Sequence, residues 1–500
     1  MSVVKKFIGD TAIYGLSTIV SRLLNFVLTP VFVRKFPASV YGIFTNVYSW
    51  AALVNTFLAF GMETTYFRFL QKFEKGERNR VFNSTFIVTL CTSTVFLTLL
   101  FTFAGPIAGW FGQKGIQSIS DYQTYVTLMG VTLAVDALAV VPFAKLRSEN
   151  RPIRYGALKL VNIIVFVCVS LFFILFLPWL LKLYPQYQSY FLWYRENWLG
   201  YVFLANLIAS SVTLIMLLPE FKAFRLKVDY ELLRSMFNYS FPIFVANLSF
   251  IINEHLDKVL MPSLLPDGVG ERDLGIYGAI TKIAVFLSIF VQAFRLGAEP
   301  FFFSYAKNQH AKKTYALIME YFAIFMMLVM MGLSMNIEWL KYFIEGGNAA
   351  ETAKYWSGLD YIPLILFNYV LLGIYMNLSI WYKLSDQTRY GLYISGIGAI
   401  ITCVCCYIFI PRWSYIGAII VTSITYLTMV SLSYYWGQKN YAIPYRLRKI
   451  AGHILLGSAL VASNYILFDR NVWTGNLMLL LYIGYVAFSE RKFLLNIIRS

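Results

Sequence analysis

Histidine and cysteine are scarce in this sequence, and charged side chains are few. Three histidines and five cysteines occur among 500 residues, and Asp, Glu, Lys and Arg together make up 13%. Soluble proteins carry about a quarter of their residues as charged ones, so this composition excludes a soluble protein. The cysteines fall in apolar runs and lack histidine or acidic neighbours at metal-ligand spacing, so we predict neither a disulfide framework nor a metal centre. They are Cys91, Cys168, Cys403, Cys405 and Cys406.

Motifs of catalytic sites are missing as well. No glycine-rich phosphate loop is present. A membrane glycosyltransferase or polymerase would display acids or basic residues in a sizeable outer loop, whereas the first predicted outer connection is only residues 34–40. We therefore expect no enzymatic activity and no cofactor, apart from a coupling ion, H⁺ or Na⁺.

Long apolar runs dominate what is present. Hydrophobic residues make up 59% of the chain and the mean hydropathy is +0.63. A helix needs about 20 predominantly apolar residues to cross a bilayer. We predict an all-α integral membrane protein with about 14 transmembrane helices, over 9–33, 41–66, 83–104, 122–143, 155–180, 198–219, 236–260, 276–299, 316–337, 358–382, 391–410, 416–436, 450–468 and 475–489.

The net charge of +17 comes from Lys and Arg in short loops between the apolar runs. These residues concentrate in alternate connections, as they do on the cytoplasmic side of membrane proteins. The pattern places both termini in the cytoplasm, and the segment after Ser489 reads as an amphipathic tail on the inner face. Because topology accounts for the basic residues, no nucleic-acid partner is predicted.

One stretch occurs twice. Tyr41-Gly42 opens an apolar run that ends in Gly61-Met62-Glu63, and Tyr277-Gly278 opens another that ends in Gly297-Ala298-Glu299, with the same spacing. Duplicated spanning segments are typical of transporters. We predict two parallel repeats, a six-helix bundle over 1–222 and a second over 223–437, followed by two additional helices and the tail over 438–500.

Polar residues inside the predicted spans are the candidate functional groups. A charge inside a span costs about 2.5–3.5 kcal/mol on insertion scales, so each should face a cavity or a partner. In the first span Arg22 and Asn25 share a helical face with Thr18 and Thr29. The seventh span is densely polar. We interpret it as a cavity-facing ion network, in which Glu254 can pair with Lys258; the alternative is an inert salt bridge within the membrane.

These groups receive two predicted roles. We assign to a substrate cavity Arg22, Asn25, Asn55, Asn247, Glu254, Asp257, Lys258 and Arg295. We assign to a gate or to ion coupling Glu63, Arg68, Asp136, His255 and Glu299. Glu63 and Glu299 have the alternative of pairing with loop cations. Asp136 stands alone among apolar neighbours in the sequence, which suggests an ion site.

Short motifs resemble a known family. Ser21-Arg22-Leu23-Leu24-Asn25-Phe26, Tyr41-Gly42, and Gly61-Met62-Glu63 with Arg68-Phe69 are similar to the polysaccharide flippases (Wzx-type) of the multidrug/oligosaccharidyl-lipid/polysaccharide exporter superfamily. The first motif is also similar to the lipid II flippases of that superfamily, whose cavities use arginines for the lipid pyrophosphate. Only Arg22 carries over as a site residue. The resemblance implies a V-shaped pair of bundles, with spans one, two, seven and eight lining the cleft.

The resemblance also implies a function. It is the alternating-access flipping of an undecaprenyl-pyrophosphate-linked oligosaccharide across the bacterial inner membrane, for lipopolysaccharide or surface-polysaccharide biosynthesis. The implied partners are this lipid-linked oligosaccharide, membrane lipid, and the polysaccharide polymerase and chain-length machinery. Two alternatives stay open: a cation-coupled drug or small-molecule antiporter of the same superfamily, and a non-transporting membrane transferase.

Overall fold

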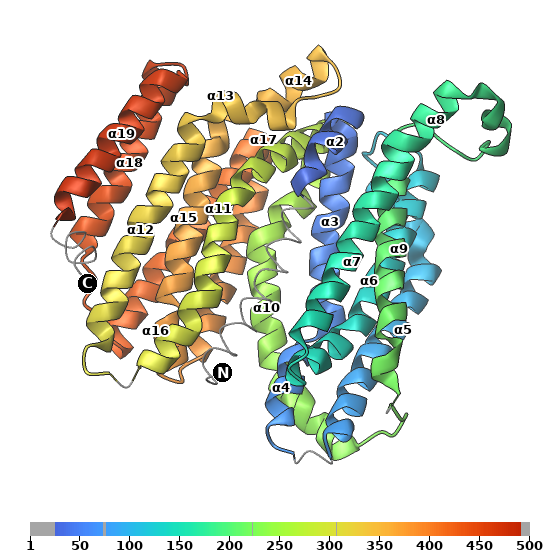
Figure 1. Ribbon diagram of the computed structural model, residues 1–500, viewed down its shortest axis with the longest axis horizontal. Coiled ribbons are helices and arrows are strands. Elements are labelled where there is room, and N and C mark those ends of the chain that lie inside the picture. Colours follow the sequence, from blue (N-terminus) through green and yellow to red (C-terminus); the bar gives the residue numbers. More distant parts are fainter. Residues whose placement is uncertain (1–25, 74–76, 223, 307, 492–500) are drawn as a thin grey trace. The chain divides into compact units, whose positions relative to one another are not determined.

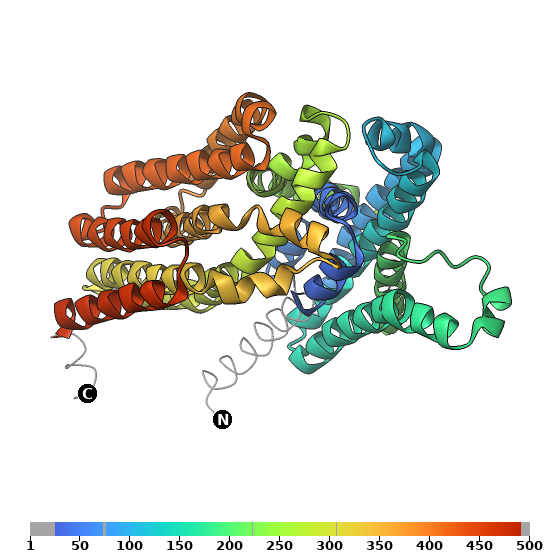
Figure 2. The same cartoon turned by 90° about the horizontal axis from the view of Figure 1, so that it is seen from above.

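A computed structural model describes residues 26–73, 77–222, 224–306 and 308–491. Over these ranges the chain forms helices joined by short turns, and no strand occurs there. Twelve helical segments of the described part are long and apolar enough to cross a membrane. The predicted all-α fold of a multi-pass membrane protein is confirmed. The chain divides into two compact units, each taken by itself below (Figures 1 and 2).

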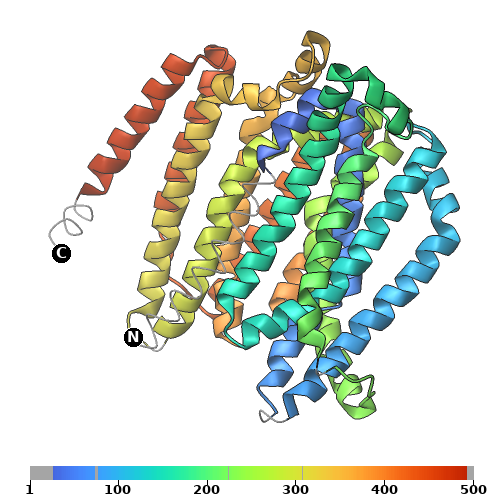
Figure 3. The same ribbon diagram turned by 45° about the vertical axis from the view of Figure 1, so that its right-hand side comes forward.

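Unit 1 ends at Gly275 and also contains Thr402–Tyr415. Within it α6 packs between α5 and α9, α7 packs on α9, and α10 lies along α3 (Figure 3). Its elements are α2 (Thr29–Lys35), α3 (Ala38–Ala59), α4 (Met62–Leu70), α5 (Arg78–Gly112), α6 (Ile119–Ser148), α7 (Pro152–Leu171), η2 (Phe172–Phe176), α8 (Leu177–Leu183), η3 (Pro185–Tyr190), α9 (Gly200–Leu217), η4 (Leu218–Phe221), α10 (Tyr230–Leu264) and the start of α11 (Val269–Tyr305).

The first copy of the repeated stretch contains a break in its helix. Phe60 and Gly61 both have left-handed backbones, with φ of 42° and 67°, so α3 ends at Ala59 and α4 begins at Met62. Glycine adopts this conformation without steric cost, which explains why it stands at the end of the apolar run. In the second copy α11 continues through Gly297 as one helix. The two copies therefore share a sequence pattern but not a helix boundary.

Unit 2 contains Ile276–Ile401 and the described residues from Ile416 onward. Within it α12 packs against α15, α18 and α19, which Figure 1 shows beside one another. Besides the rest of α11, its elements are α12 (Ala311–Met335), α13 (Ile337–Leu340), η5 (Lys341–Ile344), α14 (Ala349–Trp356), η6 (Leu359–Tyr361), α15 (Ile362–Leu378), α16 (Ile380–Leu384), α17 (Arg389–Asn440), α18 (Leu447–Leu467) and α19 (Val472–Ser489).

Polar contacts attach the last two helices to α12. Asn336 and Asn476 exchange two amide hydrogen bonds, of 3.2 and 2.9 Å. Near the other end of α12, Lys449 forms ion pairs with Glu320, at 2.6 Å, and with Glu490. The carboxylate of Glu320 is fully buried, so the ammonium of Lys449 compensates a charge that has left water.

A break within α17 separates two predicted spans. The spans predicted over 391–410 and 416–436 lie on either side of Ser414, whose φ of 51° and ψ of −131° are not helical and which follows Pro411 by three residues, so α17 consists of two helices. The first predicted span lies mostly outside the described residues, and only α2 belongs to it. The count of 14 helices and the division at 222/223 and 437/438 therefore stay predictions.

Candidate functional site

The predicted site residues lie in different parts of the structure. Arg22 and Asn25 lie outside the described residues, as does the side chain of Glu299. Three predicted cavity residues lie within membrane-spanning helices and have exposed side chains: Asn55 on α3, Asn247 on α10 and Arg295 on α11. Exposed amides are costly against lipid, because the hydrocarbon core offers no hydrogen-bonding partner.

The polar residues of α10 form local contacts. The ammonium of Lys258 forms an ion pair with Asp257 at 3.1 Å and donates a hydrogen bond of 2.9 Å to the main-chain carbonyl of Glu254. Asp257 is buried, with 2% of its surface exposed. On the same helix Asn253 accepts a hydrogen bond of 3.2 Å from Thr402 of α17. Within unit 1 Asp257 is thus a carboxylate that pairs with Lys258, and the cavity-facing role of this network stays a prediction.

Helix α3 is joined to this part of α10. The side-chain amide of Asn46 donates hydrogen bonds to the main-chain carbonyls of Lys258, at 2.8 Å, and Val259, at 3.3 Å. Both carbonyls lie in the turns that precede Pro262, and a proline within a helix leaves a carbonyl of the preceding turn without its usual N–H partner. Asn46 satisfies carbonyls in this region and fixes α3 against α10.

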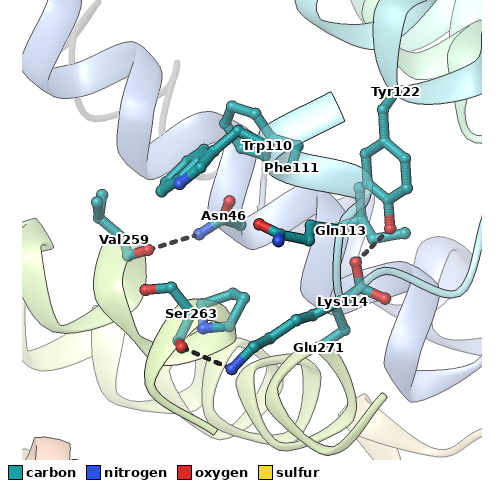
Figure 4. A pocket seen from close by; sticks show the side chains of 11 residues that line it. Asn46, Trp110, Phe111, Gln113, Lys114, Tyr122, Val259, Ser263 and Glu271 are labelled. Atoms are coloured by element: carbon teal, nitrogen blue, oxygen red, sulfur yellow. Dashed lines mark hydrogen bonds between the residues drawn. The ribbon is translucent and has the colours of Figure 1, made fainter. Parts of the chain in front are cut away.

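A pocket of about 130 Å³ lies where α3 begins, α5 ends and α10 ends (Figure 4). Trp110 and Phe111 form an aromatic wall, while Asn46, Gln113 and Glu271 line the pocket with polar atoms. The positive-inside pattern predicts that this end of unit 1 faces the non-cytoplasmic side of the membrane. We call it the predicted outer end.

Elements from both sides of the pocket are hydrogen-bonded to each other. Lys114, in the α5–α6 loop, donates to the carbonyls of Ser263 and Leu265 at 3.0 and 3.1 Å. Glu271, at the start of α11, accepts hydrogen bonds from the hydroxyl of Tyr122 and from the main-chain N–H of Ile116. The α5–α6 region is thereby attached to the end of α10 and the start of α11.

Two glycines allow the backbones of α3 and α11 to touch beside the pocket. A Cβ at Gly42 would lie 1.8 Å from the main-chain oxygen of Glu271, and a Cβ at Gly275 would lie 1.7 Å from that of Ala38. Either contact is far inside van der Waals distance, and both partners are backbone atoms, which cannot rotate away. Only glycine fits at these two positions in this structure.

Glu63 and Arg68 lie near the opposite end of α3 and α4. The carboxylate of Glu63 forms an ion pair with Arg147 at the end of α6, and Arg68 is exposed. The ion pair of Glu63 with Arg147 agrees with the alternative given in the sequence analysis, in which Glu63 pairs with a cation near the loops instead of forming a gate. The gate assignment of these two residues stays a prediction, as does the coupling role of His255, which is half-buried on α10.

Asp136 has polar neighbours that the sequence did not reveal. It interacts with Ser210 of α9 and with the ammonium of Lys159 of α7. Beside them Asn206 donates a hydrogen bond of 3.2 Å to the hydroxyl of Tyr48. Tertiary packing therefore supplies polar partners from α7 and α9 to a residue whose neighbours in the sequence are apolar. Its role in ion coupling stays a prediction.

A smaller pocket lies in unit 2. Arg295 of α11 lines it together with Lys383 and Asn377, whose amide is 2% exposed and makes no hydrogen bond within the described residues. Its volume is about 10 Å³, which corresponds to roughly one water molecule. A water can satisfy the amide, so this pocket as it stands does not accommodate a substrate group.

Hydrogen bonds and ion pairs also fix the loop between α8 and α9. Arg195 forms hydrogen bonds of 2.6 and 3.1 Å with Asp121, which raise the pKa of Arg195 above its ordinary value. Burial raises the pKa of Tyr194 to about 12.

Within the described part of the chain no group of three histidine, cysteine or acidic side chains could hold a metal ion.

Comparisons with known proteins agree with this architecture. The family model of the polysaccharide biosynthesis proteins matches residues 7–304, and that of the MatE family matches residues 242–408. No curated protein matches the sequence.

Solved structures of similar fold cover nearly the whole chain. The lipid II flippase MurJ, in an inward closed conformation, is 13% identical with a TM-score of 0.72, over 96% of this chain and 99% of that chain. The MATE multidrug transporter DinF-BH is 15% identical with a TM-score of 0.62, over 88% of this chain and 97% of that chain. The Vibrio cholerae MATE transporter VcmN, in the bent form, is 11% identical with a TM-score of 0.54, over 91% of this chain and 98% of that chain.

At these identities the structural likeness establishes the fold, while the family model covers more than half of the sequence. The predicted resemblance to the multidrug/oligosaccharidyl-lipid/polysaccharide exporter superfamily is confirmed, and the chain belongs to the polysaccharide biosynthesis protein family.

Proposed function

We propose that this protein is a flippase that moves an undecaprenyl-pyrophosphate-linked oligosaccharide across the bacterial inner membrane, for lipopolysaccharide or other surface-polysaccharide biosynthesis. The observation that carries the proposal is the fold likeness to a lipid II flippase along 96% of the chain, in a member of the polysaccharide biosynthesis family. A flippase breaks no bond in its substrate, which agrees with the missing catalytic motifs.

Exposed amides within spanning helices support a polar path. Asn55 and Asn247 lie on α3 and α10, which pack along each other, and both side chains are exposed. Lipid gives such amides no partner, whereas the hydroxyl groups of a glycan headgroup, or water around them, can hydrogen-bond with both the oxygen and the N–H₂ of each amide.

Arg22 is the residue we propose for the pyrophosphate. A guanidinium offers five donors in a planar fork that matches phosphate oxygens, and it stays charged at any physiological pH. Its position in the first predicted span places it near mid-membrane. Alternating access then requires closure around the headgroup followed by opening on the other side. We propose H⁺ or Na⁺ as the coupling ion and Asp136 as its candidate site.

A cation-coupled drug antiporter is the second candidate. The MatE match over residues 242–408 and the fold of MATE multidrug transporters favour it. The two candidates differ in the charge of their cargo: a cationic drug is attracted by acids, whereas a pyrophosphate is attracted by arginine and lysine. We therefore expect Arg22→Ala to abolish flipping of a pyrophosphate-linked lipid but not export of a cationic drug.

Genetic complementation tests the proposal. The chain is expressed in a bacterial strain that lacks its own oligosaccharide flippase but keeps the glycosyltransferases for the repeat unit, and surface glycan is measured. We expect the unsubstituted chain to restore it, Arg22→Ala to abolish it, and Arg22→Lys to restore part, because lysine keeps the charge but loses the fork.

Arg34→Ala is the matched control, since Arg34 is an exposed arginine at the end of α2, and we expect full glycan. Membrane insertion of every variant is checked by immunoblot. Normal glycan in an inserted Arg22→Ala variant would remove Arg22 from the substrate site. Failure of the unsubstituted chain to restore glycan, together with resistance to a cationic dye, would favour the antiporter.

A further inference from the structure

We propose that the segment between α8 and α9 carries a binding surface for neutral sugar units. We call residues 184–193 the aromatic tip, because five of these ten residues are aromatic and none is charged. The proposal rests on the proposed function: a flippase for a lipid-linked oligosaccharide delivers its glycan to the side of the membrane where this segment is predicted to lie. The neutral rings of that glycan are the ligand.

The aromatic tip is attached to unit 1 through residues 194–201, which we call the base. Arg195 forms hydrogen bonds of 2.6 and 3.1 Å with Asp121, and the indole of Trp198 donates one of 2.8 Å to the same carboxylate. Asp121 lies in the first turn of α6, directly before the pocket residue Tyr122. The base therefore lies at the predicted outer end of unit 1.

Stacked aromatic rings hold the base in one conformation. The ring of Tyr201 stacks on those of Phe173 and Tyr194, with centroid distances of 4.8 and 5.4 Å. The hydroxyl of Tyr194 donates a hydrogen bond of 2.9 Å to the main-chain carbonyl of Phe173. Phe173 lies in the π-helical turn η2, and such turns occur frequently at functional sites. A base fixed in this way limits the entropy that the aromatic tip loses when a ligand binds.

The rings of the aromatic tip are accessible to a ligand. Four aromatic side chains are 43–76% exposed: Tyr184, Tyr187, Tyr190 and Trp193. Gln186, Gln188 and Ser189 lie between the tyrosines and are exposed as well. A sugar ring has a face of C–H groups that packs on an aromatic face, and it has hydroxyl groups that hydrogen-bond with amides and hydroxyls. The aromatic tip offers partners for both.

Ion pairs within the segment favour a neutral ligand over a phospholipid headgroup. Lys182 and Arg195 are the only basic residues between residues 160 and 221. Lys182 pairs with Glu196 at 3.0 Å, and Arg195 pairs with Asp121 at 2.6 Å. Segments that bind anionic lipid surfaces use Lys and Arg side chains to meet the phosphates. Here both cations already have an acid as partner, whereas a neutral sugar requires no cation.

The helix before the aromatic tip is long enough to carry it past the hydrocarbon. The spanning run Pro152–Leu183 has 32 residues and is therefore about 48 Å long. The hydrocarbon core is about 30 Å thick, and the bilayer with its headgroups about 40–45 Å. Figure 1 shows the segment extending beyond α8 before it returns to α9. We therefore expect the tip at the outer edge of the headgroup layer, where it can meet a glycan.

Binding of a free oligosaccharide to the detergent-purified protein tests the surface. The probe is the repeat-unit oligosaccharide released by mild acid from the lipid-linked precursor of the complementation strain, and its dissociation constant is measured by saturation-transfer NMR. We expect Tyr187→Ala/Tyr190→Ala to weaken binding about tenfold, a factor that corresponds to about 1.4 kcal/mol. Tyr187→Phe/Tyr190→Phe keeps both rings for stacking, and we expect it to retain most of the affinity.

Leu192→Ser is the matched control, because Leu192 is 86% exposed in the same tip but has no ring, and we expect the parent affinity. Insertion of the tip into lipid is the alternative. Nanodiscs with brominated phosphatidylglycerol measure it through the fluorescence that Trp193→Phe removes, and we expect little quenching of that fluorescence. Strong quenching, together with equal sugar affinity in the parent and in Tyr187→Ala/Tyr190→Ala, would show a membrane anchor and overturn the surface.

The outcomes separate this surface from the flippase itself. Suppose that the unsubstituted chain restores surface glycan but binds no free oligosaccharide, or that Tyr187→Ala/Tyr190→Ala binds it equally well. Either result would overturn the surface and leave the flippase intact. Absence of restored glycan with the unsubstituted chain would instead refute the flippase, and the surface with it. Melting temperatures near that of the parent show that each variant is folded.

Discussion

Glu220 offers a direct test of how buried charges hold the predicted cytoplasmic ends of unit 1 together. Its side chain is 4% exposed and lies at 3.1 Å from Arg151, 3.0 Å from Arg154 and 3.6 Å from Lys145, which come from the end of α6 and the start of α7. The same lysine also donates a hydrogen bond of 2.8 Å to the main-chain carbonyl of Glu220. We predict that Glu220→Gln destabilises the protein.

The magnitude follows from the burial of the partners. Removing one member of a fully buried ion pair costs about 3–5 kcal/mol, whereas an exposed pair contributes below about 1 kcal/mol. Here the acid is buried, but its three cations are 17–38% exposed and are partly screened by water. The expected loss is therefore between these limits, about 2 kcal/mol.

Thermal unfolding of the detergent-purified protein measures this loss. For a chain of 500 residues, about 2 kcal/mol corresponds to a fall in melting temperature of roughly 2 °C, because the entropy of unfolding is about 2.1 cal/mol/K per residue. Glu149→Gln is the matched control: Glu149 lies in the same cluster but is 41% exposed and pairs with Arg151 at 3.3 Å. We expect almost no change in the control. Equal melting temperatures for the two variants would show that burial of Glu220 contributes nothing.

Two further predictions concern helix ends. Lys449→Met removes the nearer cation of the buried carboxylate of Glu320, which keeps the largely exposed Arg446 at 3.7 Å, and also removes the cation that pairs with Glu490. We expect a loss of about 2 kcal/mol in the free energy of unfolding. Adding Glu320→Gln should restore part of it in the same melt, and no recovery would contradict the pairing. Asp229→Ala removes the N-cap of α10 and an ion pair of 2.7 Å with Arg80, so we expect a loss of about 1 kcal/mol, with Asp229→Asn close to the parent. The hydrogen bond from Arg80 lowers the pKa of Asp229. Asp229 therefore stabilises the folded protein above the ordinary carboxyl pKa, about 4, and this stabilisation is lost as the pH falls below that value. If the melting temperatures of the parent and of Asp229→Ala fall equally between pH 7 and pH 3, this prediction is contradicted.

The sequence by itself determined the helical membrane fold. A bilayer core requires that every backbone polar group be satisfied within a segment, so apolar length alone predicts helices. Residues in α5, α6 and α9 lie where the spans were predicted, with ends displaced by several residues. The repeated stretch and the motifs around Gly61 also led to the right family, because they are short-range patterns.

Tertiary structure decided which polar groups meet. Glu271 and Tyr122 are far apart in the sequence, and neither stands out in its own helix, yet they bond at the predicted outer end. Asp136 gained Lys159 and Ser210 as neighbours only through the packing of α6 with α7 and α9. Hydropathy records how each segment meets lipid, but a hydrogen bond depends on the position and rotation of two helices. Those are set by side-chain packing between segments, which no local pattern contains.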